Sequence, residues 1–306
     1  MTKPAPQLSV RWLNNQPYLL LSLTSLFWAG NIVLARHVAG HVPPMTLSCV
    51  RWIGAFLTLL PFARPYLARD WPVLRAHLPL VIGLSATGFA FNNALSYWAL
   101  QFTQALNALL LQSSGPLFVA LWALILFGRL TWAQLAGIAL SLLGVLTIIL
   151  RGDLWALVGI RFNIGDIMFA GALLSFGLYS ALMTRRPVMH QLSLICFTMA
   201  IGAILLLPLS IWEYANGITL KFDLITVVTL IYVVVFASAL AYLFFNRGVA
   251  LIGPNRAAPF LHLVPVFGSA MAILLLGEEP RLFHLVGYVL VLAGVVIASR
   301  KASVAK

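Results

Sequence analysis

The chain has few side chains that could perform acid–base or metal chemistry. All seven acidic residues fall in polar connectors or at the ends of apolar runs, and they are Asp70, Asp153, Asp166, Glu213, Asp223, Glu278 and Glu279. Enzymes that use paired acids or a bound metal need such groups gathered around one point, and no such set is evident. The two cysteines, Cys49 and Cys196, lie inside apolar runs and lack CxxC spacing, which disfavours a disulfide or a metal site. We therefore expect no catalytic residue, no metal site and no cofactor.

Two ionisable side chains, Arg51 and His262, lie inside apolar runs. Arg51 comes within the first two turns of its run, where it could snorkel to the membrane surface or hydrogen-bond a neighbouring helix. Binding a substrate carboxylate is the alternative for this arginine. His262 is predicted to be a neutral, packed histidine, with a cavity-lining or proton-sensing role as the alternative. No carboxylate stands in the middle of a run, which disfavours tight coupling to protons or sodium.

Uncharged polar and aromatic residues recur within the runs at helical spacing. Asn93 and Tyr97 are four residues apart and share one helix face, as do Ser238 and Tyr242. Interhelical hydrogen bonds are a sufficient explanation for any one of these residues. The whole set favours a water-accessible cavity, in which aromatic rings would stack on a flat or cationic solute. The predicted binding residues are Trp28, Asn31, Asn93, Tyr97, Ser113, Tyr179, Tyr242 and His262.

These residues belong to a chain that is too apolar for an ordinary soluble domain. Of its 306 residues, 62% are hydrophobic and 8% are charged, whereas an average domain has about 45–50% apolar and about 25% charged residues. This composition excludes a soluble globular domain, a disordered chain and a nucleic-acid binder with a charged surface. A spanning helix needs about 20 apolar residues, so ten spans would take up about two thirds of the chain.

Charges, prolines and glycines divide the chain into ten apolar runs. They cover residues 18–35, 44–63, two runs within 76–128 that part at residues 101–104, and then 130–150, 167–184, 192–212, 224–246, 257–277 and 282–299. Small residues at 38–40 could mark a signal-peptide cleavage site, but the polar interior of the first run favours a retained helix. The predicted fold class is an all-α polytopic membrane protein with ten transmembrane helices.

Basic residues predict the orientation of these helices. The 19 Lys and Arg against 7 Asp and Glu give a net charge of +12. The termini and loops 2–3, 4–5, 6–7 and 8–9 carry 13 of the basic residues, the other loops carry 5, and Arg51 lies within a run. The positive-inside rule then places both termini in the cytoplasm.

The two halves of the chain repeat each other at an offset near 149 residues. The matched pairs are Pro116 with Pro265, Gly128 with Gly277, Gly137 with Gly287 and Gly144 with Gly294. Because each half has five runs, an odd number, equivalent segments would cross the membrane in opposite directions. We therefore predict two five-helix inverted-topology repeats, residues 1–152 and 153–306, with a site between them at the membrane midplane.

The same motifs carry a family resemblance. The order Pro116…Phe127-Gly-Arg-Leu-Thr131…Gln134…Gly137…Gly144-Val145, repeated as Pro265…Leu276-Gly-Glu278…Gly287…Gly294-Val295, resembles EamA-type members of the drug/metabolite transporter superfamily. Within that superfamily the chain looks most like the YddG-type exporters of aromatic amino acids. One departure is Gly128-Arg129, where the second half has Gly277-Glu278, and it puts in doubt any role that needs both glutamates.

The resemblance implies an exporter in a bacterial inner membrane. Its substrates would be small metabolites, amino acids including aromatic ones, carried by alternating access around a cavity lined by runs one, three, four, six, eight and nine. The expected partners are a small-molecule substrate and the lipid bilayer, with no nucleic acid, and one chain would suffice for function. The alternatives are a carrier of sugar phosphates or nucleotide sugars, a channel, and a membrane-embedded enzyme. Since no run has a central carboxylate, downhill or membrane-potential-assisted efflux is favoured over tight proton coupling.

Overall fold

A computed structural model describes residues 13–127, 132–152, 163–252 and 258–299, and these ranges contain helices but no strand. Gly128, Arg129 and Asp153 lie outside the described residues. The first half contains α2 (Pro17–His37), α3 (Pro44–Ala76), α4 (Leu78–Ser85), η1 (Ala86–Phe91), α5 (Asn92–Ala99), α6 (Ala105–Gln112), α7 (Gly115–Phe127) and α8 (Trp132–Ile149). The second half contains α9 (Ile164–Leu182), η3 (Met183–Arg185), α10 (Gln191–Ala215), α11 (Leu224–Ile231), η4 (Tyr232–Leu240), α12 (Ala241–Ile252), η5 (Ala258–His262), α14 (Leu263–Leu276) and α15 (Leu282–Ser299).

The protein is a multi-pass membrane protein. In the described part of the chain, six helical segments are long and apolar enough to cross a membrane, namely Pro17–His37, Pro44–Ala76, Leu78–Ala99, Ile164–Arg185, Gln191–Ala215 and Leu224–Ile252. A seventh candidate is the pair Ala105–Gln112 and Leu117–Leu126, which is bent by 50°. Leu135–Ile148, Phe260–Leu276 and Leu282–Ile297 are shorter apolar helices.

Most helix ends agree with the predicted runs, but α3 does not. The connector predicted at residues 101–104 is confirmed, because α5 ends at Ala99 and α6 begins at Ala105. The run predicted to end at residue 63 instead continues as helix to Ala76, through Pro61, Pro65 and Pro72. Its last turns include charged residues, because helix formation follows backbone hydrogen bonding and does not stop where the apolar segment stops.

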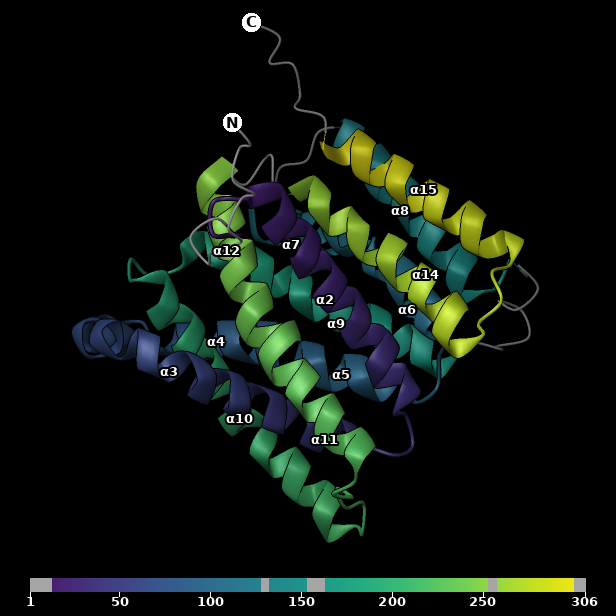
Figure 1. The fold of residues 1–306 in the computed structure, drawn as a ribbon. Helices are drawn as coiled ribbons and strands as arrows, with labels where there is room; N and C mark the ends of the chain where they lie inside the picture. The colour runs from purple at the N-terminus through teal and green to yellow at the C-terminus, as the bar shows by residue number, and fades with distance from the viewer. Residues whose placement is uncertain (1–12, 128–131, 153–162, 253–257, 300–306) are drawn as a thin grey trace, which may run out of the picture.

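The helices form a bundle with two paired edges (Figure 1). Helix α8 packs along α15 at the upper right of the view, and α3 packs along α10 at the opposite edge. Between these pairs, α2 contacts α12 and α14, while α9 contacts α5 and α7. Helices α6 and α14 also contact each other, so the centre of the bundle is built from both halves of the chain.

The repeated glycines meet in the contact between α8 and α15. A Cβ atom on Gly144 would lie 2.6 Å from the carbonyl oxygen of Gly287, and one on Gly294 would lie 2.5 Å from the carbonyl oxygen of Gly137. No side chain fits at either distance, so glycine is required where these two backbones approach each other.

Acidic side chains near the ends of helices bind the N-termini of other helices. Glu213, near the end of α10, accepts hydrogen bonds from the backbone N–H groups of Met45 (2.9 Å) and Thr46 (2.7 Å) in the first turn of α3. In return, Asp70 of α3 accepts a bond of 2.8 Å from the N–H group of His190, which caps α10. These carboxylates satisfy backbone donors that a helix leaves free at its first turn. The two helices therefore cap each other.

Candidate functional site

Arg51 lies at the centre of a buried polar cluster. It is seven residues beyond the start of α3, about 10 Å along the helix axis, and it is 4% exposed. Its Nε donates to Oγ of Ser238 at 2.7 Å, and its Nη2 donates to the carbonyl oxygen of Ala237 at 3.3 Å. Its Nη1 donates to Oδ1 of Asn93 at 2.9 Å and to Oη of Tyr97 at 2.7 Å. The snorkelling interpretation is therefore wrong, whereas the interhelical hydrogen bonds are confirmed.

Each side chain that accepts from Arg51 passes a hydrogen bond on to a further group. Tyr97 donates to Oδ1 of Asn31 in α2 at 2.7 Å. Nδ2 of Asn93 donates to the carbonyl oxygen of Phe89 at 3.0 Å. The hydroxyl of Ser238 donates to a carbonyl oxygen five residues earlier in η4, at 2.7 Å. These bonds fix the oxygen atoms of all three acceptors toward the guanidinium group.

Two π-helical segments supply backbone carbonyl groups to this cluster. The segment η1 interrupts the span formed by α4 and α5, and η4 interrupts the span formed by α11 and α12. In η4, the carbonyl oxygen of Ala237 accepts from Arg51 and also from Nε1 of Trp28 at 3.2 Å. In η1, the carbonyl oxygen of Phe89 accepts from Nε1 of Trp52 at 2.9 Å. Widening a helix to the π form frees such carbonyls for side chains, and π segments are frequent at functional sites.

The positive charge of Arg51 is not paired with an acid in the described part of the chain. The ion pairs found there are His41 with Asp223 and Arg69 with Asp70. Every group that accepts a hydrogen bond from Arg51 is a neutral amide, hydroxyl or carbonyl. The cluster therefore carries a net positive charge in the interior of the helix bundle.

Aromatic side chains from five helical segments form a series of ring contacts that begins beside the guanidinium group. Its Cζ atom stands 4.5 Å from the ring centroid of Trp52, which is a cation–π contact. Trp52 lies 4.9 Å from Phe89 and 6.3 Å from Tyr242, and Phe89 lies 5.9 Å from Tyr179. Tyr242 in turn lies 5.9 Å from Trp28. We call these five residues, Trp28, Trp52, Phe89, Tyr179 and Tyr242, the aromatic cluster.

Six of the eight predicted binding residues meet at this place. Asn31, Asn93 and Tyr97 join it by hydrogen bonds, and Trp28, Tyr179 and Tyr242 join it by ring contacts. Ser113 and His262 have no hydrogen bond or ring contact to the other six within the described ranges. Ser113 is buried, and its hydroxyl oxygen has no hydrogen-bond partner within the part of the chain that the structure describes. His262 lies at the end of η5 and is half-buried.

The predicted binding residues did not include Trp52, Phe89 or Arg51. A lone arginine within an apolar run was a usable signal, because burying a charge between helices is costly and marks functional positions. Phe89 offered no signal, since its place depends on η1, and no local pattern in the sequence predicts a π-helix.

A second buried cluster joins α6, α9 and α15. Asp166 is fully buried and accepts hydrogen bonds from the hydroxyl of Thr103 and from Nδ2 of Asn107, the latter at 3.1 and 3.2 Å. Oδ1 of Asn107 lies 2.8 Å from Nε2 of His284. Asp166 is the third residue of α9, so its expected position at the end of a span is confirmed, and its charge lies at a helix N-terminus, where it is favourable.

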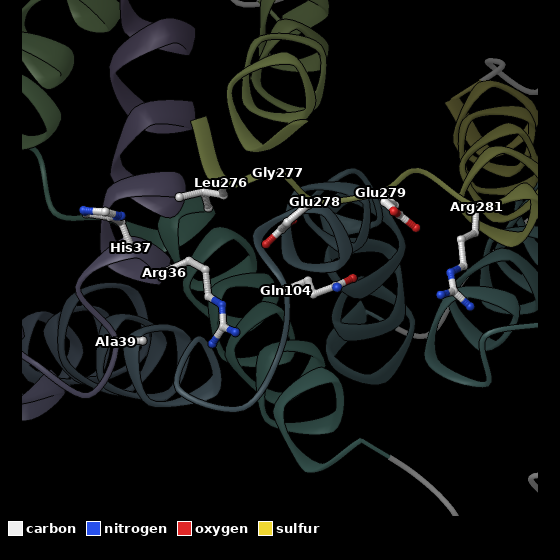
Figure 2. A pocket seen from close by; sticks show the side chains of 9 residues that line it. All are labelled: Arg36, His37, Ala39, Gln104, Leu276, Gly277, Glu278, Glu279 and Arg281. Atoms are coloured by element: carbon white, nitrogen blue, oxygen red, sulfur yellow. The ribbon is translucent and has the colours of Figure 1, made fainter. Parts of the chain in front are cut away.

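A cavity of about 570 Å³ lies among the helix connectors. Arg36, Gln104 and Glu278 project into it from three separate segments (Figure 2). Glu278 also accepts hydrogen bonds from the N–H groups of Ala105 (2.8 Å) and Leu106 (2.7 Å) at the start of α6. None of the eight predicted binding residues lines this cavity. Arg36 also donates a hydrogen bond of 2.9 Å to the carbonyl oxygen of Leu100, just beyond the end of α5.

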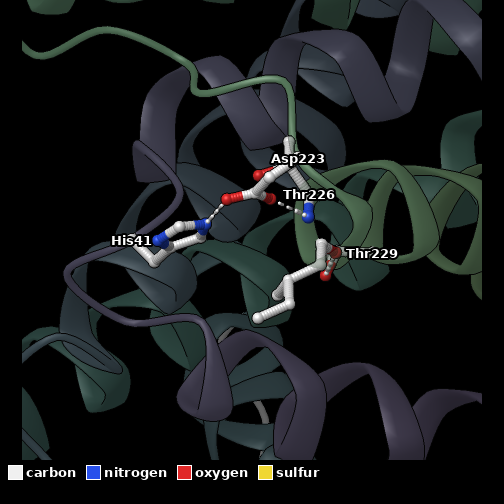
Figure 3. A network of polar contacts seen from close by, with 5 residues as sticks. His41, Asp223, Thr226 and Thr229 are labelled. Carbon is white, nitrogen blue, oxygen red and sulfur yellow. Dashed lines mark hydrogen bonds and ion pairs between the residues drawn. The ribbon is translucent and has the colours of Figure 1, made fainter.

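An exposed ion pair ties the α2–α3 connector to the start of α11 (Figure 3). Nε2 of His41 lies 2.7 Å from Oδ2 of Asp223, and Oδ1 of Asp223 accepts from the N–H group of Thr226 at 2.9 Å. The backbone hydrogen bond from Thr226, together with the nearby His41, lowers the pKa of Asp223 below its ordinary value.

A bundle of apolar spans with a polar, charged cluster buried at its centre is typical of membrane transport proteins. The EamA-like transporter family matches residues 15–150 and again residues 163–300, and the chain belongs to this family. It is 30% identical to the "Probable amino-acid metabolite efflux pump" of Salmonella typhimurium, over 91% of this chain and 93% of that one. It is 28% identical to the "Probable terminal-alkyne amino-acid exporter" of Streptantibioticus cattleyicolor, over 92% of each chain. A solved crystal structure that is 19% identical has the same fold, with a TM-score of 0.59 over 92% of this chain and 96% of that chain.

Proposed function

We propose that the protein exports small metabolites, amino acids including aromatic ones among them, by alternating access. The observation that carries this proposal is the buried cluster around Arg51, to which α2, α3, α5 and η4 contribute polar groups and beside which aromatic rings gather. The names of the two relatives above, an efflux pump for amino-acid metabolites and an amino-acid exporter, support the same class of substrate. A carrier of sugar phosphates is less well supported, because Arg51 is the one cation in this cluster among the described residues.

We further propose ten spans arranged as two inverted five-helix repeats, residues 1–152 and 153–306. The six long spans, the bent pair and the three shorter apolar helices together make ten. The double match to one family supports the division into halves. Helix packing supports an inverted relationship: α3 and α10 cap each other, and the contact of α7 with α9 has a counterpart in that of α14 with α2. The π segments η1 and η4 also occupy the third span of each half.

Both termini are proposed to face the cytoplasm of a bacterial inner membrane. The distribution of basic residues supports this orientation, and the start of α2 and the end of α15 lie at the same end of the bundle in Figure 1. Cysteines introduced as Arg247→Cys and Lys221→Cys provide a test, because both native cysteines are buried. In intact cells a membrane-impermeant thiol reagent should label the Lys221→Cys variant and leave the Arg247→Cys variant unlabelled. The reverse result would refute the orientation.

In the proposed cycle the two halves rock about the Arg51 cluster. Opening toward one side must separate groups contributed by different halves, such as Arg51 with Ser238 and Glu278 with the start of α6. One chain contains both halves, so no partner subunit is required. Because the cluster has no acid among its described members, the transport step has no evident proton carrier there, and we propose downhill efflux.

Proteoliposome counterflow tests the proposal. Vesicles loaded with unlabelled phenylalanine should accumulate labelled phenylalanine when they contain the protein, and equally loaded vesicles without the protein should not. A proton ionophore should leave the initial rate unchanged. Tyr242→Ala should reduce the rate, whereas Tyr214→Ala, at an exposed position of α10, should not. Strict dependence on an imposed pH gradient would exclude downhill efflux, and failure with a full panel of amino acids would exclude the proposed substrates.

A further inference from the structure

We propose that Arg51 anchors one carboxylate group of the substrate, and that the site selects its substrates by this carboxylate and not by an amino group. This inference rests on the proposed transport function and concerns the same cluster. It narrows the substrate class to monocarboxylates that carry an apolar or aromatic tail.

The buried charge of Arg51 has no acidic partner among the described residues. Arg51 is buried, and every group that accepts a hydrogen bond from it among the described residues is neutral. Taking a cation out of water is costly unless a counter-charge accompanies it, and buried ionisable groups inside membrane spans therefore mark functional sites. A substrate carboxylate is the simplest counter-charge for one guanidinium group, whereas a doubly charged phosphate would call for a second cation.

The hydrogen bonds of Arg51 leave room for one more acceptor from a substrate. A guanidinium group has five N–H donors, and four acceptors engage Arg51: Ser238, Asn93, Tyr97 and the carbonyl of Ala237. Among the described residues, one N–H group on Nη2 therefore has no acceptor, and the other N–H group on Nη2 makes the longest bond of the set, 3.3 Å to Ala237. A carboxylate that approaches Nη2 gains the free donor and replaces the weakest acceptor. It forms charge-assisted bonds, which are roughly twice as strong as neutral ones.

The rings beside Arg51 suit an apolar or aromatic tail on the substrate. The aromatic cluster begins at Trp52, whose ring lies 4.5 Å from Cζ of Arg51, so an apolar or aromatic tail attached to the carboxylate meets rings directly. No Asp or Glu of the described residues forms a hydrogen bond or ion pair with Arg51 or with the aromatic cluster. A substrate ammonium group would therefore find only ring faces and neutral oxygens there, which bind a cation far less selectively than an acid does. Amino acids then qualify as substrates through their carboxylate.

Two analogues of phenylalanine separate the contributions of its charged groups. 3-Phenylpropionate keeps the carboxylate and lacks the amine, whereas phenethylamine keeps the amine and lacks the carboxylate. In counterflow of labelled phenylalanine by the wild-type protein, we expect 3-phenylpropionate to inhibit at a concentration at least about tenfold lower than phenethylamine does. Equal inhibition, or stronger inhibition by phenethylamine, would overturn the inference without use of any variant.

A matched pair of variants links this preference to Arg51. Arg51→Gln removes the charge but keeps hydrogen-bond donors, and Arg69→Gln removes an exposed charge from the same helix. In detergent, 3-phenylpropionate should raise the Tm of the wild-type protein and of Arg69→Gln but not that of Arg51→Gln, while phenethylamine raises none of them. A ligand-induced rise that survives in Arg51→Gln would refute the anchor. If Arg51→Gln fails to fold, the comparison of the two analogues on the wild-type protein is by itself the test of the carboxylate preference.

The outcomes distinguish this inference from the proposed function. If no amino acid is transported but 3-phenylpropionate still raises the Tm through Arg51, amino-acid export fails and the carboxylate anchor stands. If phenylalanine is transported but phenethylamine competes as well as 3-phenylpropionate does, export stands and the anchor fails.

Discussion

The hydroxyl of Tyr97 accepts a hydrogen bond of 2.7 Å from Nη1 of Arg51, and it holds that guanidinium group against a second span. The same hydroxyl donates at 2.7 Å to Asn31, so one oxygen atom connects α3, α5 and α2. All three side chains are buried. Loss of this one oxygen would therefore leave a donor and an acceptor unsatisfied in the interior.

Tyr97→Phe tests this relationship. The substitution keeps the ring and removes the hydroxyl, so Arg51 loses an acceptor and Asn31 loses a donor. We expect a loss of about 1–3 kcal/mol in stability, seen as a lower Tm in detergent, and a reduced rate of counterflow. Tyr214→Phe, on an exposed ring, is the control and should leave both values unchanged. A Tm for Tyr97→Phe equal to that of the wild-type protein would contradict the structural role of the hydroxyl.

The glycine contact between α8 and α15 gives a second prediction. Gly144→Ala would place a methyl group 2.6 Å from the carbonyl oxygen of Gly287, and backbone cannot move aside as a flexible side chain can. Overpacking of this kind typically costs about 1–3 kcal/mol. Gly171→Ala in α9 is the matched control, because no atom of the described residues outside its own stretch of helix lies within 4 Å of the added group, and it should be neutral or raise the Tm. Thermal unfolding of both variants measures the difference, and equal Tm values would contradict the close approach.

The neighbouring acids Glu278 and Glu279 provide a third comparison. Glu278 binds two N–H groups at the start of α6, whereas Glu279 is exposed and makes no hydrogen bond or ion pair among the described residues. Glu278→Gln removes the charge that complements the helix N-terminus and one of the two acceptor oxygens. We expect it to lower stability by about 1–2 kcal/mol, and we expect Glu279→Gln to have no effect on the Tm. Equal effects of the two substitutions on the Tm would show that the cap formed by Glu278 does not stabilise the protein.

A fourth prediction concerns pH. The pKa of Asp223 is lower in the folded protein than its ordinary value, so its carboxylate favours folding at neutral pH. That contribution is lost as the pH falls through the folded-state pKa, because the unfolded chain takes up the proton first. Asp223→Asn keeps an oxygen that can accept from Thr226 but removes the charge. The Tm difference between the wild-type protein and Asp223→Asn should therefore be present at pH 6, should begin to shrink below about pH 4, and should vanish only below the folded-state pKa. A Tm difference that grows on acidification would contradict the lowered pKa of Asp223.

Much of the helical framework could be predicted from the sequence because its signals are local. Apolar runs bounded by charges, prolines and glycines predicted most spans, and the connector at residues 101–104 is where α5 and α6 part. The spacing of the repeated glycines indicated that Gly137 and Gly144 correspond to Gly287 and Gly294, but only the structure shows that Gly144 lies against Gly287. Hydrophobicity and backbone preference act within about 20 residues, which is the length of one span.

The assembly of the site was decided by tertiary structure. Arg51 and Ser238 are 187 positions apart, and the sequence alone could not tell whether this arginine reached the membrane surface or another helix. The mutual capping of α3 and α10 and the carbonyl groups freed by η1 and η4 likewise depend on how distant helices pack. Burying a charge requires partners to be supplied from several sides at once. Only the packed bundle brings those partners together, so the sequence determined which segments span the membrane and the fold determined what surrounds Arg51.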